Sequence, residues 1–184
     1  GKAHQALYKI LKENDEQKEV GISLNTACFK AETIWGWLPA KITDWWFHSR
    51  CATPFKLCDY WGLSYYAFIP FSPFPITEID NPGVLAKKGI AHDKMWGYKP
   101  EGLLKILHRF SKKYKKPIFI TENGICTTDD EKRIKAIKDY LKISHQAIEK
   151  GVDLKGYIHW STFDNFEWHL GPNYRFGLVQ VNFE

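Results

Sequence analysis

Apolar residues follow two different spacings along the chain. Short runs rich in Val, Ile, Tyr and Trp predict four strands, at residues 20–25, 61–68, 117–121 and 156–161. Between the strands, apolar residues recur every three or four positions and predict helices, at residues 4–13, about 42–57, 100–114 and 129–150. This alternation is typical of βα units that build a parallel sheet.

The helix predicted at 129–150 has the clearest boundary signals. Thr128 and Glu131 have the spacing of a capping box, and Gly151 follows the last turn. Its buried side is predicted to comprise Ile134, Ile137, Leu141, Ser144 and Ile148. A long loop is predicted at 69–99, where Pro, Gly and aromatic residues are frequent. Loops of that length inside compact domains are usually functional or mobile.

Composition places the chain among globular proteins, because 44% of its 184 residues are hydrophobic and 26% are charged. We expect one domain, residues 1–184. The net charge of +5 comes largely from lysines on predicted helix faces, without the basic stripe of a nucleic-acid surface. No run of eighteen apolar residues occurs, so no membrane association is expected.

The four cysteines have no CxxC pair and no His spacing suited to zinc. We therefore expect no metal and no cofactor, and free thiols in a reducing cytoplasm. The aromatic content of 16%, with eight Trp, is more informative about a possible ligand. Sugar sites place flat aromatic faces against a pyranose ring, although most aromatic residues are expected to fill the core.

The first segment that carries chemistry is Ile120-Thr121-Glu122-Asn123-Gly124, at the C-terminal end of a predicted strand. Barrel enzymes place catalytic groups at this end of their strands. The alternative is a strand-ending turn in which Asn123 and Gly124 supply special backbone angles and Glu122 is solvated.

The second segment follows the last predicted strand and runs from Trp160 to Trp168, with the sequence WSTFDNFEW. Its two terminal indoles bracket Glu167 and can stack on a sugar ring while the carboxylate binds hydroxyl groups. The alternative for the Trp residues alone is an aromatic loop that closes the core.

Together these two segments resemble family 1 glycoside hydrolases, in which an I/V-T-E-N-G strand carries the nucleophile and a W-S-x-x-D-N-F-E-W segment binds the sugar. Three further segments are similar to family motifs: Gly62 to Tyr66 (G-x-N-Y-Y in the family), Tyr98 to Leu103 (Y-P-E-G-L) and Arg175 to Val179. The resemblance covers essentially the whole chain.

The resemblance implies roles for individual residues. Glu122 corresponds to the nucleophile of a retaining β-glycosidase, and Tyr66 to the residue that hydrogen-bonds it. Glu167 is expected to bind two sugar hydroxyls and not to donate a proton. Trp160 and Trp168 are expected to form the wall and floor of the subsite. Ser64 stands where the family usually has Asn, which removes an amide from the site.

The resemblance also implies a fold, half of a (β/α)8 TIM barrel that covers about the fifth to eighth βα units without the final helix. A complete barrel needs roughly 250 residues. The N-E-P segment that carries the family's general acid is absent, as are the Arg, His and Asn of the early strands. We therefore expect the isolated chain to be inactive without the N-terminal half.

The expected function is that of a retaining β-glycosidase acting on β-glucosides or β-galactosides, as oligosaccharides or as aryl or alkyl glycosides. The expected partner is a complementary N-terminal half-barrel or a second copy, because a half-barrel leaves strand edges unpaired. The alternative is a noncatalytic carbohydrate-binding or scaffold protein. The intact Thr121 to Gly124 segment favours the enzyme, and the missing acid favours the binding protein.

Overall fold

A computed structural model describes residues 1–71 and 82–184 of the chain. Its centre is a four-stranded parallel sheet in which each strand pairs with the next in sequence. The strands are β1 (Gly21–Ala31), β2 (Tyr60–Phe71), β3 (Ile118–Asn123) and β4 (Leu154–His159). The predicted strands and their parallel pairing are confirmed, although β1 and β2 both extend further than predicted.

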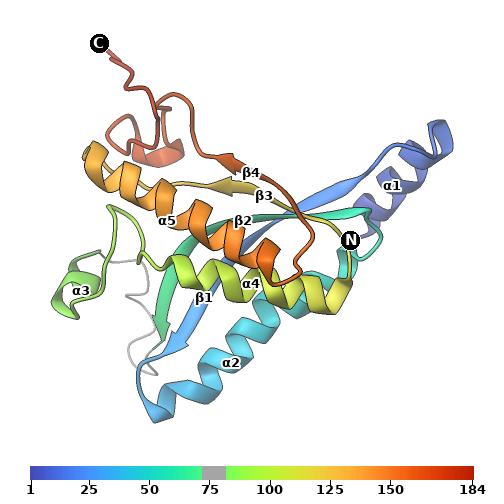
Figure 1. Cartoon of the computed structure of the whole chain (residues 1–184), viewed down its shortest axis with the longest axis horizontal. Helices are drawn as coiled ribbons and strands as arrows, with labels where there is room; N and C mark the ends of the chain where they lie inside the picture. Colours follow the sequence, from blue (N-terminus) through green and yellow to red (C-terminus); the bar gives the residue numbers. More distant parts are fainter. Residues whose placement is uncertain (72–81) are drawn as a thin grey trace.

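Helices α2 (Trp37–Trp45), α4 (Pro100–Tyr114) and α5 (Asp130–Glu149) lie on one face of the sheet (Figure 1). Helix α1 (Lys2–Asn14) projects beyond the N-terminal end of β1. Helix α3 (Pro82–Lys87) lies between β2 and α4. The predicted bounds of α4 are confirmed, since Pro100 is its first residue and Tyr114 its last.

Two predicted segments differ from the structure. The helix predicted at about 42–57 begins at Trp37 and ends at Arg50, with a π-helical last turn from Trp46. The loop predicted at 69–99 contains the end of β2 and α3, while its residues 72–81 lie outside the described residues. Short 3-10 turns at Ile34–Gly36, Thr53–Phe55 and Trp168–Leu170 complete the described elements.

Gly151 follows the end of α5 with a positive φ, as predicted, but the predicted cap and buried side of this helix need correction. Its N-cap is Asp129, whose side chain accepts a hydrogen bond from the Lys132 amide, so Thr128 does not cap it. The buried side includes Ser144, as predicted, but Ile134, Leu141 and Ile148 are about half exposed. The residues that face the core are instead Arg133, Ala136, Tyr140, Ile143, Ser144 and Ala147.

The core fills the space between the sheet and the three helices. Trp61, Leu63 and Tyr65 of β2 are completely buried there against α4 and α5. Burial of such side chains stabilises the fold by about 1.5–3 kcal/mol each. Because successive strand residues point to opposite faces, Ser64 lies on the other face, where its hydroxyl is 3.4 Å from that of Ser23.

Candidate active site

The predicted nucleophile and its predicted partner lie together on neighbouring strands. Glu122 is near the C-terminal end of β3, and Tyr66 is in the middle of β2. The Tyr66 hydroxyl donates a hydrogen bond of 2.6 Å to Glu122 Oε1. The register explains part of this placement, because Thr26 pairs with Tyr65 and Ala27 pairs with Ala67. Tyr66 is thus the extra residue of a β-bulge, a feature that re-aims side chains near active sites.

An open cleft of about 500 Å³ lies beside this pair. Ser64, Tyr66 and Glu122 all line it, so the structure brings together three of the six predicted site residues. Glu122 is the only carboxylate among the described residues that line the cleft. The other lining residues are Asn25, Thr26, Ala27, Phe47, Ala67, Ile69 and Trp96.

The electrostatic surroundings keep the Tyr66 hydroxyl protonated. Burial raises the pKa of Tyr66 well above its usual value, and the hydrogen bond to Glu122 raises it further. The negative charges of Glu122 and Glu167 add to this effect. Tyr66 therefore acts as a permanent hydrogen-bond donor to the Glu122 carboxylate over the physiological pH range.

Asn123 and Gly124 do not form a solvated strand-ending turn, which was the alternative interpretation of this segment. Asn123 is fully buried; its amide donates to the Tyr65 carbonyl and its Oδ1 accepts from the Tyr157 hydroxyl at 2.7 Å. Gly124 has no positive φ, but a Cβ there would lie 2.1 Å from the Trp160 carbonyl oxygen. Asn123 therefore ties β3 to β2 and β4, and Gly124 lets the next loop approach.

The loop after β4 carries the remaining three predicted residues, and none of them lines the described cleft. Trp160 is 38% exposed and Trp168 is 84% exposed. The Asn165 amide donates a hydrogen bond of 2.8 Å to Glu167 Oε2. Glu167 contributes to the raised pKa of Tyr66, so its charge acts on the Tyr66–Glu122 pair although the cleft does not include it.

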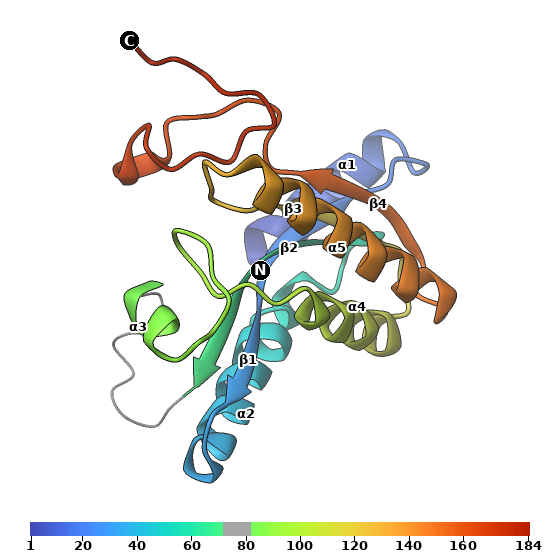
Figure 2. The same ribbon diagram turned by 60° about the vertical axis from the view of Figure 1, so that its left-hand side comes forward.

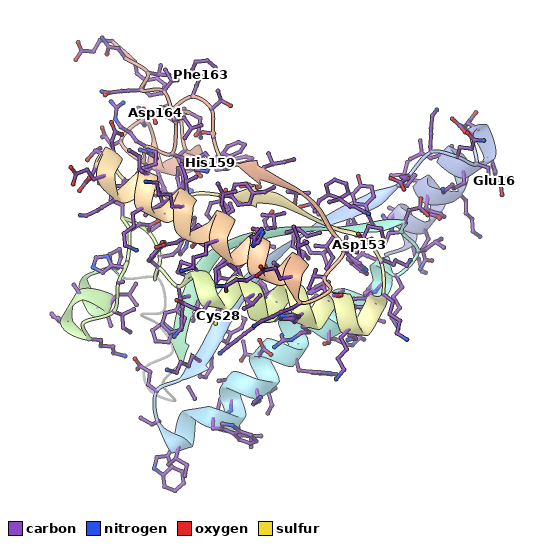
Figure 3. The ribbon with its side chains drawn as sticks, in the orientation of Figure 1. Glu16, Cys28, Asp153, His159, Phe163 and Asp164 are labelled. Carbon is purple, nitrogen blue, oxygen red and sulfur yellow. The ribbon has the colours of Figure 1, made fainter. Side chains whose placement is uncertain are left out.

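Asp164 holds this loop in place. Its side chain is almost fully buried and accepts hydrogen bonds from Arg175 Nη1 at 2.8 Å and from the Gly177 amide at 2.9 Å. Figure 2 shows the C-terminal segment looping beyond the end of β4, and Figure 3 shows Asp164 beside Phe163 in that loop, away from His159 at the strand end. The pairing joins the two family-like segments 160–168 and 175–179.

Trp96 is a site residue that the sequence analysis missed. Its ring lines the cleft and lies 5.1 Å from the Tyr66 ring, centroid to centroid. Asp93 fixes the segment by accepting hydrogen bonds from the amides of Trp96 at 2.7 Å and Cys126 at 2.9 Å. The sequence signal for Trp96 is its position in the predicted long loop, two residues before the family-like segment Tyr98 to Leu103.

The family model of glycosyl hydrolase family 1 matches residues 55–184, which is more than half of the chain. The chain belongs to this family. Relatives include "Beta-glucosidase A" of Acetivibrio thermocellus, 41% identical over 64% of this chain and 28% of the relative. "Beta-galactosidase" of Sulfolobus acidocaldarius is 39% identical over 48% of this chain and 18% of the relative. The matched segments thus cover well under a third of the length of these curated relatives.

Solved structures extend the similarity to nearly the whole family 1 chain. The crystal structure of the hyperthermophilic β-glucosidase from Pyrococcus furiosus superposes with a TM-score of 0.83 at 30% sequence identity. The match covers 98% of this chain and 41% of the other. The fold of residues before position 55 is therefore also similar to that of a known β-glucosidase.

Three further observations concern the residues that the structure describes. Within residues 1–71 and 82–184, no helix is long and apolar enough to cross a membrane. The same residues contain no group of three or more His, Cys, Asp or Glu side chains that could hold a metal ion. All four cysteines are free thiols.

Proposed function

We propose that this chain carries the nucleophile half of the active site of a retaining β-glycosidase. The observation that carries the proposal is the 2.6 Å hydrogen bond from Tyr66 to Glu122 at a cleft on the C-terminal edge of the sheet. Family membership supports the same reading. Glu122 is the proposed nucleophile, and Tyr66 is the proposed residue that orients it.

In the proposed reaction, a Glu122 oxygen bonds to the anomeric carbon as the glycosidic C–O bond breaks. The leaving oxygen takes a proton from a general acid on another segment, or leaves as an anion when it belongs to an activated phenol. Water then attacks the same carbon, gives one proton to the deprotonated general acid of the first step or to solvent, and releases the sugar, while Glu122 regains its carboxylate. Tyr66 stabilises that carboxylate by its hydrogen bond.

Sugar recognition is assigned to the loop after β4 and to Ser64. Glu167 accepts hydrogen bonds from two hydroxyl groups of a glucoside or galactoside, and Trp160 and Trp168 stack on the ring. The high exposure of both indoles leaves their faces open to a ligand. Ser64 lines the cleft beside Glu122 and offers a short hydroxyl, so a water molecule or a substrate hydroxyl fits next to it.

Residues 1–184 are proposed to form the C-terminal half of a family barrel, from about its fifth to its eighth βα unit. Among the described strands, β1 and β4 each pair on one side only, which leaves two sheet edges open. Side chains that a complete barrel would cover are exposed in α1, α5 and β4: Leu7, Ile10, Leu11, Ile134, Leu141, Ile148 and Ile158. A complementary half, upstream in the same polypeptide or in a second molecule, would close these edges.

Turnover of aryl β-glycosides by the natural polypeptide that contains these residues tests the function. We expect hydrolysis of 4-nitrophenyl β-glucoside or β-galactoside, with the β configuration retained in the first-formed sugar by NMR. Glu122→Gln should remove turnover, while Thr128→Ala, at an exposed position outside the site, should keep it. Inversion of configuration, or full activity of Glu122→Gln, would contradict the proposal.

A second candidate is a noncatalytic carbohydrate-binding or scaffold protein. It is favoured by one observation, that Glu122 is the only carboxylate among the described residues lining the cleft. Binding of a β-glucoside or β-galactoside without any turnover, even for aryl glycosides, would support this candidate over the enzyme.

A further inference from the structure

The segment before α4 contains a tight turn that the Asp93 side chain closes. Its Oδ1 accepts hydrogen bonds from the amides of Met95 at 2.6 Å and Trp96 at 2.7 Å. The Asp93 amide donates in turn to the Trp96 carbonyl at 2.9 Å. An Asp side chain that accepts from amides two and three residues ahead stabilises a local turn. Asp93 therefore fixes the backbone from which the Trp96 ring projects.

The second oxygen of the same carboxylate links this turn to the chain that follows Glu122. Asp93 Oδ2 accepts a hydrogen bond from the Cys126 amide at 2.9 Å, and the Lys94 amide donates to the Cys126 carbonyl at 3.2 Å. Cys126 follows Glu122 by four residues (126 − 122). In Figures 1 and 2 the chain between α3 and α4 extends toward the start of α5. Asp93 thus sets the position of Trp96 relative to the end of β3.

Two aromatic rings hold the Tyr66 side chain in place. The Trp96 ring lies 5.1 Å from the Tyr66 ring, and the buried Phe176 ring meets it edge-on at 6.1 Å, centroid to centroid. The bulge leaves Tyr66 out of the register described for β1, β2 and β3, so strand pairing does not restrain this residue. Aromatic pairs prefer defined ring geometries. The packing of both rings therefore decides where the Tyr66 hydroxyl points.

We propose that Asp93 is a positioning residue of the glycosidase site, which acts on Glu122 through the Trp96 ring and the Tyr66 hydroxyl. The inference rests on the proposed function and adds a residue to it. Without the Asp93 acceptor, the Trp96 ring is free to shift, and the Tyr66 hydroxyl then loses the geometry in which it donates to Glu122 at 2.6 Å. Every contact in this series joins described residues of this chain.

The rate at which a trapped glycosyl-enzyme is hydrolysed tests the role of Asp93. The natural polypeptide is labelled with an activated 2-deoxy-2-fluoro-β-glucoside and freed of excess reagent, and mass spectrometry follows the loss of the sugar. The leaving group has already gone at this stage, so a contact between it and Trp96 cannot contribute. We expect Asp93→Ala to slow the loss of the sugar about 5- to 20-fold, within the range that residues in contact show.

Two further variants keep the test independent of folding. Asp93→Asn has nearly the same shape and keeps one acceptor oxygen, so it should fold and slow the same step less, by about threefold. Lys94→Ala is the matched control in the same turn. The Lys94 ammonium donates to the Asn173 carbonyl at 3.2 Å, so its loss leaves the Asp93 acceptor intact and should change the rate by less than about twofold.

A double-mutant cycle with Tyr66→Phe separates positioning from a general structural role. Because Asp93 is proposed to act through the Tyr66 hydroxyl, both Asp93 variants should slow the step by less than about 1.5-fold once that hydroxyl is absent. An equal loss with and without the hydroxyl, or sugar loss at the unsubstituted rate in Asp93→Asn, would overturn this inference alone. Absence of any label in the unsubstituted polypeptide would overturn the proposed function as well.

Discussion

Removal of the Tyr66 hydroxyl tests the role assigned to its hydrogen bond with Glu122. The 2.6 Å bond joins a phenol to a carboxylate, and hydrogen bonds to charged groups contribute about 1.5–3 kcal/mol. In the proposed reaction, this bond stabilises the carboxylate that leaves when the glycosyl-enzyme is hydrolysed. Because a tenfold change in rate corresponds to about 1.4 kcal/mol, Tyr66→Phe should slow that step about 10- to 150-fold.

Activated aryl glycosides are suitable substrates for this test because a good leaving group speeds formation of the glycosyl-enzyme, so we expect its hydrolysis to limit turnover. We expect kcat of Tyr66→Phe to fall, the phenol to appear in a burst, and the acidic limb of the kcat/KM profile to move to higher pH. Tyr65→Phe is the matched control, because its hydroxyl donates to the Lys99 carbonyl at 2.8 Å on the helix side of β2. Unchanged kinetics in Tyr66→Phe, or an equal change in Tyr65→Phe, would refute the assignment.

Three other substitutions test separate parts of the account. Glu167→Ala should lower kcat/KM about 100-fold for hexosides and far less for pentosides without the hydroxymethyl group; an equal loss with an altered acidic limb would indicate proton transfer instead. Asp164→Asn breaks the ion pair with Arg175 at 2.8 Å and should speed hydrogen exchange at the Gly177 and Val181 amides; unchanged exchange would contradict its role as a clamp. Burial tends to raise the pKa of Asp44, but hydrogen bonds from His48 and Arg109 outweigh this effect and lower that pKa below 3.8. The ionised Asp44 side chain therefore stabilises the fold above about pH 4, and this stabilisation is lost as the pH falls through the lowered pKa. Asp44→Asn should therefore reduce the free energy of unfolding at pH 7 by about 1–3 kcal/mol and reduce it less near pH 3, measured by urea denaturation; an equal loss at both pH values would contradict this.

Strand positions were predictable because β-branched and aromatic runs identify buried strands wherever helices cover one face. Helix faces were harder to predict. In α5, Ile134, Leu141 and Ile148 have helical spacing, yet they are about half exposed, whereas Tyr140 and Arg133 are buried. The apolar pattern shows which residues prefer burial, but the tertiary contacts around α5 decide which of them the described chain covers.

Some site residues could be predicted from local sequence motifs, whereas others are recognised only by their neighbours in the fold. Glu122 and Tyr66 could be paired from family-like segments, and the structure places them 2.6 Å apart. The burial of Asn123 between three strands was not predictable, because Asn followed by Gly usually indicates a solvated turn. Trp96 was not predicted as a site residue because its own segment does not indicate a contact with the Tyr66 ring. That contact depends on the fold of the segment, which the Asp93 hydrogen bond to the Trp96 amide holds.

Covalent labelling can identify the residue that attacks the sugar, which is proposed to be Glu122. An activated 2-deoxy-2-fluoro-β-glucoside forms a glycosyl-enzyme quickly and releases it slowly, so mass spectrometry of a digest of the natural polypeptide can locate the sugar. We expect one added sugar on the peptide that contains Glu122, and no label in Glu122→Gln. A sugar on Glu167 or on any other residue, or labelling that persists in Glu122→Gln, would contradict this proposal.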